Sequence, residues 1–263
     1  MKQLIKGFFS ANTHKKIRSV INRSKSYLAA GNLNKLALIW RTDKWGMHWY
    51  TQHYHTHFKA VRNKKLNVLE IGVGGYEKPD EGGNSLRTWK QYFRKGNIYG
   101  VDIYDKSQLE EKRIKIFQGS QIDEAFLNDV CNKIGNIDII IDDGSHINNH
   151  VITTFKILFP KLKQNGLYVI EDLETAYWPE LGGDSINLNN PDTSINFLKT
   201  FIDSINHSEF INPGYKPTYF DQNIIGIHFY HNMAFIQKGN NDEKSVNIVN
   251  NNHHRLNTAV IEY

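Results

Sequence analysis

Cysteine is almost absent, because Cys131 is the only one among 263 residues. An intramolecular disulfide is therefore excluded, and such a chain suits a reducing compartment. Long apolar runs are missing as well, so no segment reaches the length of a membrane-spanning helix. The apolar residues near the start end after Phe8 and Phe9, too early for a secretory signal. These absences predict a soluble, cytoplasmic protein with no transmembrane segment.

Acidic residues are missing from the first 24 positions, which hold a group of basic residues: Lys2, Lys6, Lys15, Lys16, Arg18 and Arg23. Such a segment can bind a membrane surface or a partner, or it can be the solvated face of a basic helix, which is the commoner case. The net charge of the whole chain, +5, favours an anionic substrate or surface. It is too small to indicate nucleic-acid binding, so no nucleic-acid partner is predicted.

Short, continuous apolar runs recur along most of the chain. They cover residues 66–73, 97–104, 136–143 and 166–173, with a weaker run at 113–119. Continuous rather than alternating hydrophobicity indicates strands buried on both faces, as in a parallel sheet. Between the runs, residues 85–93, 123–134 and 150–162 carry apolar side chains three and four apart, which predicts amphipathic helices. The alternation predicts a doubly wound, Rossmann-like α/β domain over residues 66–239.

The ends of this domain follow other patterns. Residues 223–239 read as two strands joined by a tight turn around His231 and Asn232, which completes a seven-stranded, mostly parallel sheet with an antiparallel addition. Gly135 and Gly166 are predicted to end helices. Residues 1–65 look helical without the strand–helix rhythm and are predicted to form an N-terminal extension or lid. Residues 240–263 form a polar, asparagine-rich C-terminal tail.

The first predicted strand ends in a glycine-rich loop with Glu70, Gly72, Gly74 and Gly75. Glycines let a ligand approach the backbone closely, but dinucleotide-binding enzymes have such loops too. Two features favour S-adenosylmethionine. The next helix begins only near Ser85, so no helix N-terminus follows the glycines to bind a pyrophosphate. Glu70 would repel a pyrophosphate and suits the cationic amino-acid part of S-adenosylmethionine, unless it only caps a turn.

Polar side chains after the next two strands extend this predicted cofactor site. Asp102 ends the second strand, where an acidic side chain can accept both ribose hydroxyls. Gln118, Ser120 and Gln121 follow the third strand and are placed to border the adenine. Ser120 has an alternative role as a helix N-cap, with Asp123 three positions later.

Two pairs of carboxylates end strands that should be neighbours. Asp142 and Asp143 end the fourth strand, and Glu171 and Asp172 end the fifth. Carboxylates facing one another raise each other's pKa unless a cation lies between them. Oxygen ligands favour Mg²⁺, then Mn²⁺ or Ca²⁺. The prediction is a metal held by Asp143, Glu171 and Asp172, with Asp142 in support; the alternative is a helix cap and a solvated strand end.

His146 follows the fourth strand and is the predicted general base. Methyl transfer displaces the sulfonium group from its methyl carbon, and an alcohol is a poor nucleophile until it loses its proton. A metal ion on Asp143 would lower the pKa of the hydroxyl, and a histidine can accept the proton at neutral pH. Asp143 and His146 are therefore the predicted catalytic pair. The alternative for His146 is a helix cap without chemistry.

The motifs "LEIGVGGY", "GGNSLRTW", "GVDIYDKS", "QGSQ", "IDDGSHI" and "YVIEDLETAYWP" together resemble a family of metal-dependent sugar O-methyltransferases. Its best-known members methylate deoxysugars of macrolide antibiotics such as mycinamicin. The resemblance covers residues 42–178 and implies the S-adenosylmethionine methyltransferase fold. It also implies the following roles: Asp143, Glu171 and Asp172 bind Mg²⁺, His146 accepts the proton, Asp102 binds the ribose, and Ser85 and Gln118 lie near the cofactor.

The segment "TDKWGMHWYTQHY" resembles the N-terminal stretch that closes over the active site in this family. Tyr50, His53 and Tyr54 are its candidate substrate contacts, and Tyr177 is added from the motif after the fifth strand. The alternative for the first three is a packed helix with aromatic anchors.

The resemblance has one departure that affects the acceptor. Macrolide enzymes of this type carry a large additional N-terminal domain used in assembly, whereas about 65 residues precede the first strand here. The composition, rich in Asn, Lys and Ile, resembles that of low-GC bacteria. The expected acceptor is therefore a sugar of a capsular polysaccharide or other surface glycan, or its nucleotide-linked precursor. Alternatives are a macrolide-type natural-product sugar and an NAD-dependent sugar oxidoreductase. A homo-oligomer is also predicted.

Overall fold

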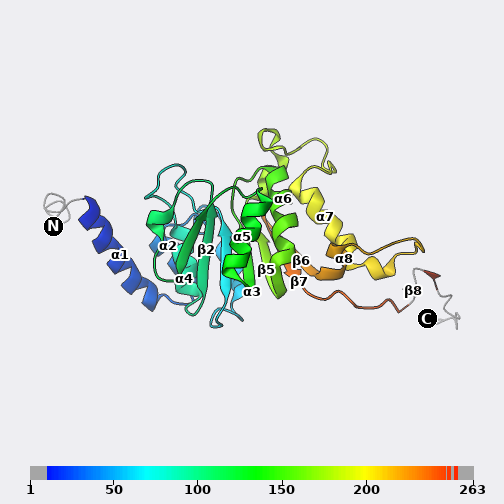
Figure 1. The fold of residues 1–263 in the computed structure, drawn as a ribbon, viewed down its shortest axis with the longest axis horizontal. Helices are drawn as coiled ribbons and strands as arrows, with labels where there is room; N and C mark the ends of the chain where they lie inside the picture. The colour runs from blue at the N-terminus through cyan, green and yellow to red at the C-terminus, as the bar shows by residue number, and fades with distance from the viewer. Residues whose placement is uncertain (1–10, 247, 250–251, 254–263) are drawn as a thin grey trace. The chain divides into compact units, whose positions relative to one another are not determined.

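The computed structural model describes residues 11–246, 248–249 and 252–253. Seven strands form one sheet in the order β3-β2-β1-β4-β5-β7-β6 (Figure 1). Neighbouring pairs β2–β3, β1–β4 and β4–β5 are parallel, whereas β5–β7 and β6–β7 are antiparallel. The predicted seven-stranded, mostly parallel sheet is therefore confirmed. Its strands are β1 (Asn67–Ile71), β2 (Asn97–Asp102), β3 (Ile114–Gln118), β4 (Ile137–Asp142), β5 (Leu162–Ile170), β6 (Ile224–Tyr230) and β7 (Met233–Lys238).

The chain divides into two compact units. The first consists of Met1–Asn67 and Val73–Gln118, and the second of Val68–Gly72 and Gly119–Tyr263. The described part of the first unit contains β2, β3 and four helices: α1 (Ala11–Leu28), α2 (Leu33–Trp40), α3 (Tyr50–Phe58) and α4 (Asn84–Tyr92). The predicted boundaries at residues 65 and 239 stay predictions. The predicted basic residues Lys2 and Lys6 lie outside the described residues, as does most of the tail after residue 249.

Aromatic packing organises the helices of the first unit. Tyr54 of α3 is fully buried, with its ring 4.7 Å from that of Trp89 and 5.0 Å from that of Phe58. Phe58 in turn lies 5.3 Å from Phe93, which follows α4. Large rings bury much apolar surface and favour such tilted and edge-to-face pairs. The contacts fix α3 against α4.

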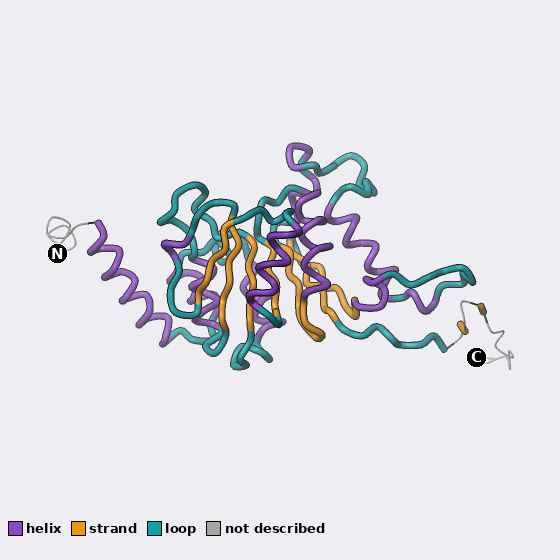
Figure 2. Tube along the Cα trace, in the orientation of Figure 1, coloured by secondary structure: helices purple, strands orange, loops and turns teal. Residues whose placement is uncertain are grey.

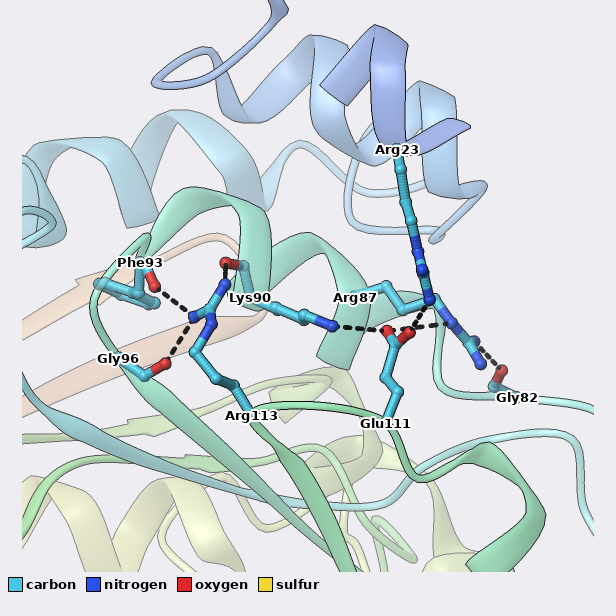
Figure 3. Close-up of polar contacts among 8 residues, drawn as sticks. All are labelled: Arg23, Gly82, Arg87, Lys90, Phe93, Gly96, Glu111 and Arg113. Atoms are coloured by element: carbon cyan, nitrogen blue, oxygen red, sulfur yellow. Dashed lines mark hydrogen bonds and ion pairs between the residues drawn. The ribbon is translucent and has the colours of Figure 1, made fainter. Parts of the chain in front are cut away.

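A cluster of charged residues around Glu111 also stabilises the first unit (Figure 3). The Glu111 carboxylate forms an ion pair with Arg23 of α1 and lies 3.2 Å from Nζ of Lys90 and 3.8 Å from Nε of Arg87, both on α4. Burial lowers the pKa of Arg87 and Lys90, and Glu111 opposes that shift. One carboxylate thus offsets two half-buried cations, Arg87 and Lys90, and the exposed Arg23.

The second unit contains β1, β4, β5, β6 and β7 with helices α5 (Glu124–Ile134), α6 (Asn148–Leu158), α7 (Ser194–Ile205) and α8 (Tyr219–Asn223). Helix α6 lies between β4 and β5 along the chain, and Figure 2 colours the helices purple and the strands orange. Ile140, Tyr168 and Val169 on the two central strands are fully buried, as the continuous apolar runs predicted. Phe155 of α6 packs its ring 4.8 Å from that of Tyr168 and so attaches the helix to the sheet.

Helix ends show one confirmed prediction and two wrong ones. Gly135 ends α5 with φ 78°, as predicted. The N-cap of α5 is Asp123, whose side chain accepts a hydrogen bond from Phe126 N at 3.0 Å, so the alternative of Ser120 as cap is wrong. Gly166 does not end a helix but lies inside β5. The preceding helix ends at Leu158, because Pro160 has no amide hydrogen to continue it.

The C-terminal hairpin agrees with its prediction. β6 and β7 are joined at His231 and Asn232, and Asn232 adopts φ 61°, which a tight hairpin turn requires. β7 pairs antiparallel with β5, so the hairpin extends the sheet. Two further strands of two residues each, β8 (Ile248–Val249) and β9 (Asn252–His253), pair beyond it. Among the described residues, no helix is both long and apolar enough to cross a membrane.

Candidate active site

The carboxyl ends of three strands meet within the second unit. Ile71 of β1 is in register with Asp142 of β4, which is in register with Ile170 of β5. The ladders continue one residue further, because Asp143 N donates to Ile71 O and Glu171 N donates to Asp142 O, each at 3.0 Å. Ligand sites of open α/β sheets lie at such strand ends. The predicted residues after β4 and β5 therefore start from the same edge.

Three carboxylates gather at this edge. Glu70, Asp143 and Glu171 each place an oxygen within 4.8 Å of the others. Glu70 is fully buried and Glu171 is 4% exposed, whereas Asp143 is half-buried. Hard oxygen donors in a shielded setting are the ligands that Mg²⁺, Mn²⁺ and Ca²⁺ prefer. The geometry can hold a divalent cation.

A second group of possible metal ligands also includes Asp143. Ligand atoms of Asp143, His146 and Asp172 also lie within 4.8 Å of one another, and Nε2 of His146 is 3.6 Å from Oδ2 of Asp172. The predicted ligands Asp143, Glu171 and Asp172 are thus distributed over two groups that meet at Asp143. The predicted base, His146, belongs to one group, and Glu70, predicted for the cofactor, belongs to the other.

The backbone at two of these residues is left-handed. His146 has φ 58° and Asp172 has φ 54°. A residue with a Cβ loses roughly 1 kcal/mol or more in this conformation, so the surrounding structure must stabilise it. The N-cap of α6 is Ile147, so the imidazole of His146 precedes the helix and does not cap it. The alternative prediction of His146 as a helix cap is wrong.

Asp142 belongs to neither group of possible metal ligands, and its side chain is buried. Its carboxylate accepts hydrogen bonds from Nε2 of Gln121 at 3.5 Å and from the hydroxyl of Tyr168 at 3.4 Å. Burial, and next the negative charge of Asp143, raise the pKa of Asp142 to about 7. Asp142 therefore supports the loop that carries Asp143, as the sequence indicated.

Gln121 organises the same loop, a role that sequence reasoning missed. Its Oε1 accepts from Ser145 N at 2.8 Å, and its Nε2 donates to Oγ1 of Thr154 on α6 at 3.0 Å. A Cβ at Gly144 would lie 2.4 Å from that Oε1, so a larger residue there would displace the Gln121 side chain from its hydrogen bonds. Gln121 is buried, whereas the sequence placed it near adenine. The signal that would have found it is its position directly after a strand and before a capped helix.

Gly72 explains how the glycine-rich loop reaches the acidic group. It adopts φ 90°, and a Cβ there would lie 2.0 Å from the carbonyl oxygen of Asp143. Only glycine allows this approach of the backbone after β1 to the backbone after β4. Glu70 is consequently held beside Asp143. Ser120 lies in the same unit, half-buried, with its Oγ accepting from Ile122 N at 3.4 Å.

Four other predicted cofactor residues lie in the first unit. Asp102 accepts backbone hydrogen bonds from Val73 N and Tyr104 N, both at 2.9 Å, so its carboxylate is fixed while each oxygen can accept another donor. Gly74 has φ 74° and open space at its Cβ position. Ser85 is 9% exposed in the first turn of α4, and Gln118 is exposed at the end of β3.

The loop between Gly74 and α4 is long, as predicted, because α4 begins only at Asn84. Lys106 anchors this loop: its fully buried Nζ donates to the carbonyl oxygens of Lys78 at 2.7 Å and of Glu81 at 3.2 Å. Sequence reasoning missed this residue, because the sequence alone gives no sign that a lysine is buried.

The predicted substrate contacts divide between the units. In the first, Tyr54 is fully buried and Tyr50 is 3% exposed, with its ring stacked 4.7 Å from His48. This agrees with the alternative of a packed helix with aromatic anchors. His53 is half-buried, and desolvation lowers its pKa. In the second unit, Tyr177 is 41% exposed at the end of the 3₁₀ helix Leu173–Tyr177 and is the most accessible of the four.

No known family model matches the chain. Several curated proteins are similar to it. Mycinamicin VI 2''-O-methyltransferase of Micromonospora griseorubida is 50% identical over 217 residues, which are 82% of this chain and 54% of that protein. The 8-demethyl-8-alpha-L-rhamnosyl tetracenomycin-C 2'-O-methyltransferase of Streptomyces olivaceus is 48% identical over 77% of this chain and 53% of its own length. The chain spans about half the length of these relatives.

A solved structure of such a methyltransferase is also similar to this chain. The MycE methyltransferase of the mycinamycin biosynthetic pathway, in complex with Mg and SAH, superposes with a TM-score of 0.80 at 50% identity. The match covers 82% of this chain and 56% of that one. The Rossmann-like methyltransferase fold expected from the motifs is confirmed. Over the region that it shares with these proteins, the chain is a homologue of the macrolide sugar O-methyltransferases.

Proposed function

We propose that this chain is an S-adenosylmethionine-dependent O-methyltransferase in which a divalent cation orients a sugar hydroxyl and His146 accepts its proton. One observation carries the proposal: acidic side chains and a histidine gather around Asp143 at the strand ends. They do so in a chain that is 50% identical to mycinamicin VI 2''-O-methyltransferase.

The residues around Asp143 fit a hard divalent cation. Asp143 offers a carboxylate oxygen within 4.8 Å of ligand atoms of Glu70 and Glu171 in one group and of Asp172 in the other, and a cation beside Asp143 would relieve the repulsion among these carboxylates. The homologous MycE structure contains Mg. We propose Mg²⁺, with Mn²⁺ as a substitute, held by Asp143, Glu171 and Asp172. Bound there, the ion would lower the pKa of the acceptor hydroxyl.

The reaction is a single displacement. The acceptor oxygen attacks the sulfonium methyl carbon, a C–O bond forms and a C–S bond breaks, which yields a methyl ether and S-adenosylhomocysteine. His146 takes the hydroxyl proton, and Asp172, 3.6 Å from its Nε2, stabilises the resulting imidazolium. For the cofactor we propose Asp102 on the ribose and Glu70 toward the amino group. The further proposed contacts are Gly72, Gly74, Ser85, Gln118, Ser120 and Asp143.

For the acceptor we propose a sugar of a natural-product glycoside. The relatives' names specify mycinamicin VI and a rhamnosyl tetracenomycin, which supports the alternative prediction over the main one. Neither name refers to a capsular polysaccharide or a nucleotide sugar, so these expectations found no support. Tyr177 is the proposed acceptor contact of the second unit, because it is the accessible one. The predicted homo-oligomer stays a prediction.

The test is a pair of acceptor panels, one of macrolide and rhamnosyl glycosides and one of nucleotide sugars. Each is incubated with S-adenosylmethionine, with Mg²⁺ or with EDTA, and products are detected by mass spectrometry. We expect methylated glycosides with Mg²⁺ and none with EDTA. Methylated nucleotide sugars alone would refute the acceptor class, and full turnover in EDTA would refute the metal. Calorimetry with S-adenosylhomocysteine and NAD checks the cofactor; binding of NAD alone would refute the methyltransferase.

A further inference from the structure

The charges of the chain are unevenly distributed. The first 42 residues contain nine of the 32 Lys and Arg residues and none of the 27 acidic ones. The remaining residues therefore hold 23 basic against 27 acidic side chains and are net negative. A positive potential concentrated at one segment attracts an anionic surface. In the described structure this segment contains α1 and α2.

α1 also exposes large apolar side chains. Ile17, Val20 and Ile21 are 44%, 62% and 48% exposed, and Leu28 is 88% exposed. Their spacing of three, four and seven residues places them on one side of the helix. Water-exposed apolar side chains in a row beside basic residues are the pattern of helices that lie in a membrane interface. A phosphate backbone of nucleic acid offers no partner for this apolar row.

A groove continues this surface onto α2. It has a volume of about 600 Å³. Ile17, Ile21, Leu38 and Ile39 supply its apolar lining, and Arg18, Lys25 and Arg41 supply its charges. Arg18, Lys25 and Arg41 are all exposed. Long basic side chains can lay their methylene groups along apolar surface and direct their charge to phosphates, which suits an anionic lipid.

Residues of α1 outside the groove attach the helix to the rest of the first unit, so the orientation of its apolar and basic surface is fixed within that unit. Arg23 pairs with Glu111, as Figure 3 shows, and the guanidinium of Arg94 lies 4.7 Å from the ring centroid of Tyr27. Ser26 is fully buried in the same part of the helix. The residues that anchor α1 are therefore different from those that line the groove.

We propose that α1 and the facing side of α2 bind the surface of an anionic phospholipid bilayer. Ile17, Val20 and Ile21 would enter the interface, while Arg18 and Lys25 would contact lipid phosphates. The proposal concerns the first unit and does not depend on methyl transfer.

The experiment is co-sedimentation of the full chain with vesicles of phosphatidylcholine mixed with phosphatidylglycerol, and with vesicles of phosphatidylcholine alone. We expect binding to the mixed vesicles only, weakened by salt because the attraction is screened. Equal binding to both kinds, or to neither, would overturn the proposal.

Variants locate the binding surface. Arg18→Gln and Lys25→Gln should each weaken binding about fivefold, as expected for one basic residue near an anionic surface. Val20→Ser should weaken it several-fold, whereas Arg18→Lys should keep it. The matched control is Lys133→Gln on α5, an exposed lysine in the second unit, which should change nothing. Equal losses for Lys133→Gln and Arg18→Gln would overturn the proposal.

Two other occupants of the surface are tested with the same variants. A concentration-dependent dimer, lost in Val20→Ser and formed without vesicle binding, would identify a second copy of the chain and overturn the proposal. Binding of duplex DNA that depends on Arg18 and Lys25, without vesicle binding, would do the same.

Discussion

Each unit contains a cluster of charged side chains, and the two clusters differ in the signs of the charges that they bring together. Around Glu111 in the first unit, a single carboxylate is surrounded by Arg23, Arg87 and Lys90. Around Asp143 in the second unit, carboxylates gather with one another and with His146. The first arrangement lowers the electrostatic energy of the folded chain by its own contacts. In the second arrangement the carboxylates repel one another, and a ligand with positive charge would relieve that repulsion.

This difference indicates that the Glu111 cluster stabilises the fold and that the Asp143 cluster binds a ligand. Attraction among fixed side chains needs no ligand, so the Glu111 cluster should matter for unfolding and not for turnover. Repulsion among buried carboxylates costs stability, and proteins retain it where a ligand uses it. Substitutions in the two clusters separate these roles.

Asp143→Asn should nearly abolish turnover. Asp143 belongs to both groups, so its loss removes a proposed metal ligand and a neighbour of His146. We expect a decrease in kcat/KM of at least about a thousandfold, or ~4 kcal/mol, in a steady-state assay with saturating Mg²⁺. Asp129→Asn, an exposed carboxylate on α5, is the matched control and should keep full activity. An active Asp143→Asn enzyme would remove the metal from the proposal.

His146→Ala should lose turnover but not the metal. Removal of a general base lowers kcat by about 10²–10⁴-fold. Because the carboxylates remain, Mn²⁺ affinity measured by paramagnetic relaxation should change little. An unchanged kcat would show that the proton goes to another group, and a simultaneous loss of Mn²⁺ binding would make His146 a ligand instead.

Glu111→Gln should destabilise the fold without affecting chemistry. The variant leaves Lys90 and Arg87, which are 12% and 20% exposed, without their carboxylate. We expect the free energy of unfolding in urea to fall by about 2 kcal/mol. The exposed Asp129→Asn control should cost less than about 0.5 kcal/mol. If Glu111→Gln loses turnover at unchanged stability, the contrast between the two clusters does not hold.

Asp142 gives a pH test of the acidic cluster. Its pKa is about 7 in the folded chain against an ordinary value of 3.8, so between these values the folded state binds more protons than the unfolded state. Stability of metal-free protein should therefore fall as pH rises from about 4 to about 7, by at most about 1.4 kcal/mol per unit. Asp142→Asn should remove this slope in urea titrations with EDTA. Equal slopes for both proteins would contradict the assignment.

The sequence predicted the architecture well because its signals are local. Continuous apolar runs located the parallel strands, and the turn at His231 and Asn232 located the hairpin. The general rule that strand ends share one edge then brought Asp143 together with the residues after β5. Gly166 was misassigned because a glycine ends a helix or interrupts a strand equally well.

Contacts between distant residues were not predictable in the same way. Gln121 reaches Thr154 across 33 positions, and no periodicity signals that pairing. Glu70 was assigned to the cofactor alone, yet it lies opposite Ile141 of β4, two residues before Asp143, and its carboxylate is within 4.8 Å of that of Asp143. The order of a doubly wound sheet, in which the first and fourth strands are neighbours, would have indicated this. Tyr54 was ambiguous because an aromatic residue suits a core and a binding surface alike.

The left-handed backbone at His146 and Asp172 has a consequence for directed evolution. Glycine adopts that conformation without the steric penalty, so a selection for heat resistance alone should favour His146→Gly and Asp172→Gly. Under the proposed mechanism both would be inactive. A thermostability campaign on this chain should therefore hold these two positions fixed, because there the most stable sequence and the working enzyme diverge.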